Sequence, residues 1–189
     1  MTGSTQLFFR QLLTKPKQVS AITPSSRWLA RAMAQDLGPQ TGRVVEFGPG
    51  TGHLTTGILA AGVAAKDLTL FEMSDDFVAH LRQRFAGVTV HLAGAETAAT
   101  WVKPGVGAVI SGLPLLSMPL QLREKIIQAA FDILAPGGTY YQFTYGARPP
   151  LNADQLHRMG LTVTAGPRVW ANIPPARIFL FRRATDSQH

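Results

Sequence analysis

Three glycines directly after a short apolar run form the first pattern in the chain that could do chemistry. The stretch VVEFGPGTGHLT, residues 44–55, contains Gly48, Gly50 and Gly52. A glycine loop after a strand lets the backbone come close to a ligand. A dinucleotide loop needs a third glycine where His53 stands, and a P-loop ends in Gly-Lys-Ser/Thr, which is absent here. Both phosphate-binding interpretations are therefore disfavoured.

Two glutamates add a charge pattern to this loop. Glu46 precedes the first glycine by two residues, where a carboxylate would repel a pyrophosphate and attract an ammonium. Glu72 closes the next apolar run, where an acid can accept hydrogen bonds from both hydroxyls of a ribose. A ribonucleoside that carries a cationic amino acid, such as S-adenosylmethionine, fits both features. The alternative is a tight turn flanked by two solvated carboxylates.

The elements that must position these residues alternate along the chain. Glycine and proline positions and apolar periodicity predict strands at 43–47, 67–72, 88–92, 109–111 and 139–145, with a closing hairpin of 161–164 and 178–182. They predict helices at 4–15, 24–37, 54–62, 75–85 and 120–134, the last ending at Pro136-Gly137-Gly138. This alternation indicates an α/β fold with a mostly parallel sheet and helices on both faces.

Composition limits the classes of function. The 189 residues are 46% hydrophobic and 15% charged, as expected of a globular chain, and they include no cysteine, which excludes disulfides and thiolate metal sites. The five histidines show no metal-ligand spacing, so no metal is expected. The net charge of +7 favours a polyanionic partner, either nucleic acid or an anionic membrane. No signal peptide and no bilayer-spanning run is recognised, so we expect a cytoplasmic protein.

Four successive motifs resemble those of the class I S-adenosylmethionine-dependent methyltransferases. They are VVEFGPGTGHLT, FEMSDDF, HLAGAET and VISGLPLLSMP. The resemblance implies a Rossmann-like, seven-stranded sheet with a reversed last hairpin. It also implies S-adenosylmethionine as cofactor and S-adenosylhomocysteine as product. The implied cofactor-binding residues are Ser25, Glu46, Gly48, Gly50, Thr51, Gly52, Glu72, Met73, Ala95, Glu96 and Ser111. The family often has aspartate where Gly94 stands, so the adenine contact departs from its pattern.

Two branches of this family share the motif E-x-G-P-G-x-G and differ in the molecule that accepts the methyl group. They are the ribosomal RNA adenine dimethyltransferases and the bacterial phospholipid N-methyltransferases. Base-directed enzymes carry Asn-Leu-Pro-Tyr, whose amide accepts from the base amine and whose ring stacks on the flipped base. This chain has Gly112-Leu113-Pro114-Leu115, with neither group. Stacking alone is worth roughly 1–3 kcal/mol per base. The motif therefore disfavours a nucleobase and a nucleic acid partner.

Segments spread over nearly the whole chain resemble the bacterial phosphatidylethanolamine N-methyltransferases. They are AITPSS, SGLPLLSMP, YQFTYGARPP and NIPPARIFLFRR. The resemblance implies methyl transfer to the amine of phosphatidylethanolamine and of its partly methylated forms, toward phosphatidylcholine. Methyl transfer from a sulfonium depends on positioning, and aromatic faces stabilise the methylated cation. We expect Ser111 and Tyr145 to orient the amine, and the substrate-binding residues to be Leu113, Pro114, Tyr141, Arg148 and Arg177.

The N-terminal region is expected to contact membrane. The first 38 residues are assigned to an amphipathic helix and a lid segment, and residues 39–189 to the methyltransferase domain. Five basic residues and no acidic one precede Asp36, and a basic amphipathic helix lies in the interface of an anionic bilayer. The alternative is a helix packed on the domain. The expected membrane residues are Leu7, Phe8, Phe9, Arg10, Leu12, Leu13, Lys15 and Lys17.

These features predict a monomer that is peripheral on the inner face of the cytoplasmic membrane. Three classes of function stay open: a lipid methyltransferase, which the motifs favour, an RNA adenine methyltransferase, and an idle cofactor-fold module that only binds membrane. The sequence identifies neither the number of methyl groups added nor the group that deprotonates the amine.

Overall fold

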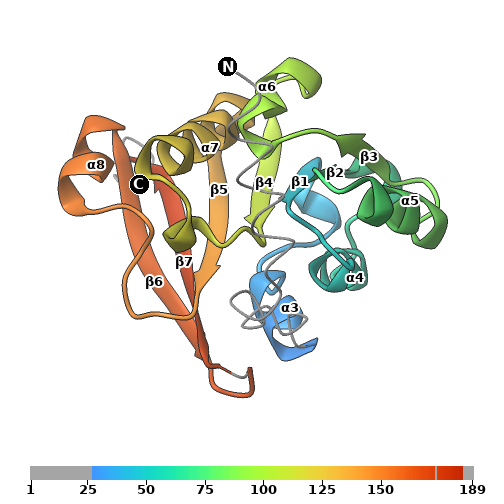
Figure 1. Cartoon of the computed structure of the whole chain (residues 1–189), viewed down its shortest axis with the longest axis horizontal. Coiled ribbons are helices and arrows are strands. Elements are labelled where there is room, and N and C mark those ends of the chain that lie inside the picture. Colours follow the sequence, from blue (N-terminus) through green and yellow to red (C-terminus); the bar gives the residue numbers. More distant parts are fainter. Residues whose placement is uncertain (1–26, 173, 185–189) are drawn as a thin grey trace.

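The computed structural model describes residues 27–172 and 174–184, and these form a seven-stranded sheet in the order β3-β2-β1-β4-β5-β7-β6 (Figure 1). The strands are β1 (Val44–Phe47), β2 (Leu68–Glu72), β3 (Thr89–Leu92), β4 (Val106–Ser111), β5 (Leu134–Thr144), β6 (Leu161–Val169) and β7 (Ala176–Arg183). The first five strands pair in parallel, and β7 runs antiparallel between β5 and β6. This confirms the predicted sheet and its reversed hairpin.

Helices cover both faces of the sheet. Helices α3 (Arg27–Met33), α4 (His53–Ala60) and α5 (Asp75–Arg84) pack on one face, through a core cluster that includes Leu29, Ile58 and Leu81. Helices α6 (Ala98–Trp101), α7 (Leu120–Ile133) and α8 (Ala153–Arg158) pack on the other. We call these the α4 face and the α7 face. Four single-turn 3₁₀ helices lie in the connections, at Pro39–Thr41, Ala65–Asp67, Ala95–Thr97 and Leu115–Ser117.

Side chains alternate between the two faces along each strand, as the pleat requires. On β5, Tyr141 and Phe143 point to the α4 face, whereas Tyr140 joins the α7-face core. On β1, Val44 belongs to the α4 face and Phe47 to the α7 face. This alternation decides which of the candidate site residues can meet.

Some predicted boundaries differ from the structure, and two short helices were not predicted. Strand β4 begins at Val106 rather than at 109, and β5 begins at Leu134, because these two residues pair ahead of a register shift. Helix α7 therefore ends at Ile133 and continues directly into a strand across the proline-glycine sequence. Helices α6 and α8 were not predicted, since four and six residues are too few to show a helical period.

The N-terminal prediction is described only in part. Of the predicted helix 24–37, the structure describes α3 and the turn that follows it to Leu37. Leu29, Met33 and Leu37 are buried in the α4-face core, so the described part of the predicted lid segment packs on the domain. The predicted helix 4–15 and the eight expected membrane residues between Leu7 and Lys17 lie outside the described residues.

Candidate functional site

The glycine loop crosses the carboxyl end of β1, where the sheet order reverses between β1 and β4. Ligands of open parallel sheets bind at such a point. Gly48, Gly50 and Gly52 all have positive φ, at 67°, 53° and 82°, which favours glycine. A β-carbon at Gly48 would clash with the Leu113 side chain, whereas one at Gly50 would have no atom within 4 Å. The loop is therefore tightly packed at its start and open at Gly50.

Backbone amides on both sides of Glu72 fix its carboxylate. One oxygen accepts hydrogen bonds from the N–H groups of Met73 at 2.8 Å and Ser74 at 2.9 Å. The other accepts from the N–H of Gly50 at 3.1 Å, which ties the end of β2 to the glycine loop. Each carboxylate oxygen has two lone pairs, so further acceptor sites remain for ligand hydroxyls. Glu72, the residue predicted to bind the ribose, is therefore held by three hydrogen bonds that also tie β2 to the glycine loop. We call this set of hydrogen bonds the bracket.

Glu46 lies on the α4 face of β1 and is fully buried. Its Oε2 accepts a hydrogen bond from the Thr55 hydroxyl of α4 at 2.6 Å, and its Oε1 has no partner among the described residues. Burial raises the pKa of the Glu46 carboxyl to about 8; the Thr55 hydroxyl opposes this shift and the charge of Glu72 adds to it. A buried acceptor without a donor is a site for a cationic group.

The residues expected at the adenine lie beside this bracket. Met73 is half-buried directly after Glu72, and Ala95 is buried at the start of a single-turn helix. The N–H of Ala93 donates to the Glu72 carbonyl at 3.0 Å, which joins the segment after β3 to the end of β2. Glu96 has a buried Oε2 with no hydrogen bond. The structure therefore brings the residues predicted for ammonium, ribose and adenine to the ends of adjacent strands.

Two other predicted cofactor residues stand apart from this bracket. Thr51 is exposed, and its carbonyl accepts from Arg84 of α5 at 2.7 Å. Ser25 lies outside the described residues.

The two residues expected to orient the acceptor do not bring their side chains together. Ser111 is fully buried on the α7 face, where its Oγ accepts from the Leu113 N–H at 3.3 Å and interacts with Tyr140. Tyr145 packs on the α4-face core, with its ring edge-on to Phe143 at a centroid distance of 5.5 Å. Only the backbone of Ser111 can therefore share a site with the Tyr145 hydroxyl.

Tyr145 and Tyr141 line the α4 face near the carboxyl end of β5. The hydroxyl oxygen of Tyr145 is buried and makes no hydrogen bond of ordinary geometry with residues 27–172 or 174–184. Burial raises the pKa of Tyr145, and the nearby Asn172 side chain partly offsets this effect. Burial also raises the pKa of Tyr141, with Asp36 acting in the same direction. Both phenols therefore keep their protons at neutral pH and can donate a hydrogen bond.

The remaining substrate candidates are placed on two sides. Leu113 is buried against Gly48, and Pro114 beside it is half-buried. Arg148 is exposed and lines a hollow of about 680 Å³ between the start of α7 and α8, on the α7 face. Arg177 pairs with Thr144 across β7 and β5, and its Nε is buried without a partner in the part of the chain that the structure describes. The two arginines flank the end of β5, whereas Tyr141 and Tyr145 lie on the α4 face.

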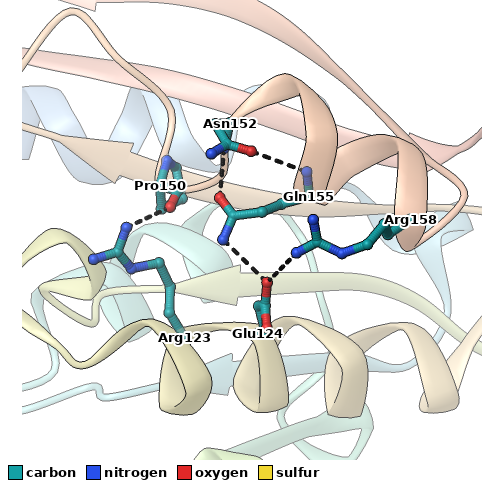
Figure 2. A network of polar contacts seen from close by, with 6 residues as sticks. All are labelled: Arg123, Glu124, Pro150, Asn152, Gln155 and Arg158. Carbon is teal, nitrogen blue, oxygen red and sulfur yellow. Dashed lines mark hydrogen bonds and ion pairs between the residues drawn. The ribbon is translucent and has the colours of Figure 1, made fainter.

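A polar network holds the segment after β5 against α7 (Figure 2). Arg123 of α7 donates to the Pro150 carbonyl at 2.6 Å, and Glu124 accepts from Gln155 at 3.0 Å and from Arg158 at 3.2 Å. Asn152 and Gln155 exchange hydrogen bonds in a capping box that begins α8. The network fixes the path of the chain that follows Arg148.

Sequence reasoning missed two residues that organise the site. Thr55 lies between Leu54 and Ile58 on the buried side of α4, and a polar residue on an apolar helix face is the signal that could have found it. Gln142 is fully buried and donates to the Leu113 and Phe143 carbonyls at 2.9 Å and 2.8 Å. Its partner Leu113 lies 29 residues earlier, so no local pattern marks Gln142.

Two searches of the described residues gave no result. No group of three or more His, Cys, Asp or Glu residues in residues 27–172 and 174–184 could hold a metal ion. Among the helices of these same ranges, none has the length and apolar character that crossing a membrane requires.

Comparison with known proteins gives one curated relative with clear similarity. The ornithine lipid N-methyltransferase of Singulisphaera acidiphila is 29% identical over 192 residues, which cover 96% of this chain and 97% of that protein. No family model matches the chain.

Solved structures similar to this one are methyltransferases. The glycopeptide N-methyltransferase MtfA in complex with S-adenosyl-L-methionine has a TM-score of 0.68 at 17% identity, covering 86% of this chain and 96% of that one. A TehB-like S-adenosylmethionine-dependent methyltransferase from Corynebacterium glutamicum has a TM-score of 0.63 at 13% identity, covering 95% and 98%. TrmN from Thermus thermophilus has a TM-score of 0.64 at 16% identity; 89% of this chain is covered, but only 53% of TrmN. The chain has the Rossmann-like fold of the class I S-adenosylmethionine-dependent methyltransferases.

Proposed function

We propose that the chain transfers methyl groups from S-adenosylmethionine to the amine of a lipid headgroup. The observation that supports S-adenosylmethionine as the methyl donor is the pair of carboxylates at the ends of β1 and β2. Glu46 offers a buried oxygen without a partner to the cofactor ammonium, and Glu72 offers fixed acceptors to the ribose hydroxyls. Gly50 leaves open space beside them. The residues present therefore fit this cofactor, with Met73, Ala95 and Glu96 beside its adenine.

The bound cofactor supplies a methyl group on a sulfonium, and the protein supplies position. Tyr145 can orient the acceptor amine through its hydroxyl, since this group is buried on the same face as Glu46. The Ser111 carbonyl is the second candidate, because the Ser111 hydroxyl is already engaged on the α7 face. The rings of Tyr141, Phe143 and Tyr145 give aromatic faces that stabilise a methylated ammonium.

The similarity to an ornithine lipid N-methyltransferase supports a lipid amine as acceptor. The four sequence motifs favour phosphatidylethanolamine and its partly methylated forms, and the curated relative favours an ornithine headgroup. The two headgroups differ in the anionic group that accompanies the amine, which is a phosphate in phosphatidylethanolamine and a carboxylate in ornithine. Arg148 and Arg177 are the proposed phosphate ligands, and the buried unpaired Nε of Arg177 supports the second assignment.

A nucleobase acceptor is disfavoured by the packing around Gly112. A β-carbon there would lie 2.7 Å from the Gly48 carbonyl oxygen and 3.3 Å from Leu54, so the site has no room for an asparagine. Leu115, at the position of the base-stacking aromatic ring, is buried in the α7-face core. In keeping with a lipid substrate, we propose a monomer that is peripheral on the inner face of the cytoplasmic membrane, docked in part by its N-terminal segment.

Incubation with methyl-labelled S-adenosylmethionine tests this function directly. Separate reactions contain vesicles with phosphatidylethanolamine, vesicles with ornithine lipid, or ribosomal RNA. We expect label in the organic phase with at least one lipid and none on RNA, and Glu72→Ala should abolish most of it. Label on RNA at a rate matching the lipid would overturn the proposal, and no label on any substrate would indicate a binding module.

Arg177→Gln separates the two lipid acceptors. If Arg177 binds the phosphate, this variant should lose more activity toward phosphatidylethanolamine than toward ornithine lipid, whose anionic group is a carboxylate. Arg158→Gln is the matched control, because the Arg158 side chain is exposed and pairs with Glu124 of α7. Equal losses on both lipids would mean that Arg177 does not distinguish a phosphate from a carboxylate.

A further inference from the structure

Two tryptophan–arginine pairs lie on the exposed surface near the carboxyl edge of the sheet. The guanidinium of Arg27 lies 5.1 Å from the ring centroid of Trp28, and that of Arg168 lies 4.2 Å from the ring centroid of Trp170. Both rings are well exposed, Trp28 at 48% and Trp170 at 68%. Large exposed aromatic side chains on a soluble domain mark an interaction surface when they gather.

The fold brings these two pairs to the same side of the molecule. Trp28 begins α3, and Trp170 directly follows β6, at the end where β6 turns toward β7 (Figure 1). Their chain neighbours Leu29 and Val169 belong to the same core cluster, and α3 packs against β6. Residues more than 140 positions apart in sequence therefore form one edge, which we call the tryptophan edge, defined by Arg27, Trp28, Arg168 and Trp170.

The tryptophan edge borders the proposed acceptor site. Val169 pairs with Ala176 and Arg168 with Arg177, so the end of β6 lies beside the strand that pairs with the end of β5. Tyr145 follows that end and packs in the same cluster as Val169. An amine bound at Tyr145 would therefore be next to whatever covers the tryptophan edge.

The tryptophan edge itself is basic. Its charged residues are Arg27 and Arg168; Arg31 follows Arg27 by about one helical turn, and Arg177 pairs with Arg168 across β6 and β7. An anionic surface complements this charge, and each nearby cation contributes roughly 1 kcal/mol on such a membrane. Tryptophan rings place themselves at the headgroup level of a bilayer, and arginine reaches the phosphates beside them.

We infer that the tryptophan edge docks on an anionic lipid bilayer and so lays the acceptor site against the membrane. The inference rests on the proposed lipid function, because an acceptor amine anchored in a bilayer must be reached at its surface. It uses only described residues, and it is a second contact besides the one predicted for the N-terminal segment.

The three tryptophans of the chain allow a position-specific test. Trp101 is exposed at 55% and stacks on His91 of β3, the strand at the opposite edge of the sheet from β6. Full-length proteins that keep one tryptophan each, with phenylalanine at the other two positions, are mixed with vesicles containing anionic phosphatidylglycerol. We expect the emission of Trp28 and Trp170 to shift to the blue and to be quenched by brominated lipid, and that of Trp101 to stay unchanged.

Affinity measurements complete the test. Trp28→Ser and Trp170→Ser should each weaken vesicle binding on the order of tenfold, the effect of losing one large buried side chain. Arg168→Gln should weaken it about fivefold and lower its salt dependence. Trp101→Ser is the control and should bind as the unmodified chain does. Unchanged Trp170 emission on bound vesicles would overturn the inference, because docking would then occur through another surface.

The outcomes also separate this inference from the proposed function. Activity is measured in parallel on short-chain monomeric lipid, which needs no docking. Trp170→Ser with lost vesicle binding and intact activity on monomers supports both. Vesicle binding through Trp170 without methylation of any lipid keeps the docking surface and rejects the function. Quenching of Trp170 by RNA together with unchanged emission on vesicles would assign the edge to nucleic acid and overturn the inference.

Discussion

The two halves of the sheet hold their central polar residues, Glu72 and Gln142, by different means. In the half formed by β1–β3, backbone N–H groups fix a carboxylate, as Gly50, Met73 and Ser74 do for Glu72. In the half formed by β5–β7, side chains fix backbone carbonyls: Gln142 donates to the carbonyl of Leu113, and Arg183 to that of Phe131 at the end of α7. The β1–β3 half presents hydrogen-bond acceptors to the proposed methyl donor, and we call it the donor half. The β5–β7 half carries the proposed site of the methyl acceptor, and we call it the acceptor half; its polar groups hold its own chain.

Because of this difference, we expect the site of the methyl donor and the site of the methyl acceptor to respond differently to mutation. The donor half offers rigid, ligand-facing oxygens within a few residues of the glycine loop. The acceptor half is shaped by long-range contacts whose removal changes the path of a segment. The four predictions that follow test whether the halves are as independent as this comparison requires, beginning with the largest effect.

Glu46→Gln should change the pH dependence of stability most. The folded-state pKa of Glu46, about 8, lies above its ordinary value of 4.5. The protonated carboxyl therefore contributes stability that is fully present below pH 4.5 and is lost as the pH rises through 8. Because glutamine does not titrate, the variant should gain relative stability between pH 5 and 8, by at most about 5 kcal/mol. Urea unfolding at several pH values, without added cofactor, measures this.

Asp76→Asn is the control for Glu46→Gln, because Asp76 is an exposed acid at the start of α5. Its unfolding free energy is measured over the same pH range, and the change in Glu46→Gln is compared with it. Curves for Glu46→Gln that run parallel to those of the unmodified chain would mean that the Glu46 carboxyl is already ionised in the folded protein.

Gln142→Leu should damage the acceptor half alone. The variant removes the side-chain donor to the Leu113 and Phe143 carbonyls and the acceptor of the Tyr140 hydroxyl, while the Leu113 carbonyl keeps its hydrogen bond from the Leu115 N–H. Unsatisfied buried groups cost about 1–3 kcal/mol each, so we expect a loss of about 2–4 kcal/mol in unfolding free energy. Gln128→Leu on the exposed side of α7 is the matched control. Cofactor affinity of the folded variant, measured by calorimetry, should stay unchanged, and a parallel loss would contradict the independence of the two halves.

Glu72→Ala should damage the donor half alone. Hydrogen bonds to a charged group are worth about 1.5–3 kcal/mol, so S-adenosylmethionine should bind roughly 10- to 150-fold more weakly. Isothermal titration of the folded variant measures this change. Asp76→Ala removes a nearby charge outside the bracket and should leave affinity unaltered. Unchanged affinity in folded Glu72→Ala would remove Glu72 from the cofactor site.

Arg158→Ala should have the smallest effect. The side chain of Arg158 is 62% exposed and that of its partner Glu124 31%, and exposed ion pairs contribute about 0–1 kcal/mol. The Tm, followed by circular dichroism, should fall only slightly, because Gln155 still binds Glu124 and still completes the capping box of α8. A loss as large as that of Gln142→Leu would mean that the ion pair, rather than the capping box, holds the segment after β5.

The sequence predicted the donor half better than the acceptor half for a physical reason. Glu46, Gly48 and Glu72 lie at or next to the carboxyl ends of adjacent strands. Their positions along the chain therefore predict that they lie close together in the fold. The mostly parallel sheet follows from the alternation of strands and helices, whereas the reversed last hairpin was expected from the family resemblance. The early start of β5 at Leu134 could not be predicted, because pairing with Val106 overrides the proline and glycines that favour a turn.

The acceptor half depends on contacts between residues far apart in the sequence, which no local sequence pattern predicts. Ser111 and Tyr145 each end a strand of the sheet, and both were expected to orient the amine. The faces that their side chains take depend on the register between β4 and β5, and this register sends the Ser111 hydroxyl to the α7 face. The fit of Gln142 beneath Leu113 is set by the same register.

Gly112 has a consequence for how such a protein could change its substrate over evolutionary time. A side chain at this position meets the carbonyl of Gly48, which belongs to the donor loop itself. Acquiring an asparagine that reads a base would therefore displace the loop that serves the methyl donor. A lineage that moved from lipid amines to nucleobases by single replacements would pass through an intermediate with a damaged donor site. On this account the two acceptor classes are separated by a fitness valley rather than by one substitution, and reconstructed ancestors should differ at 112 together with its neighbours.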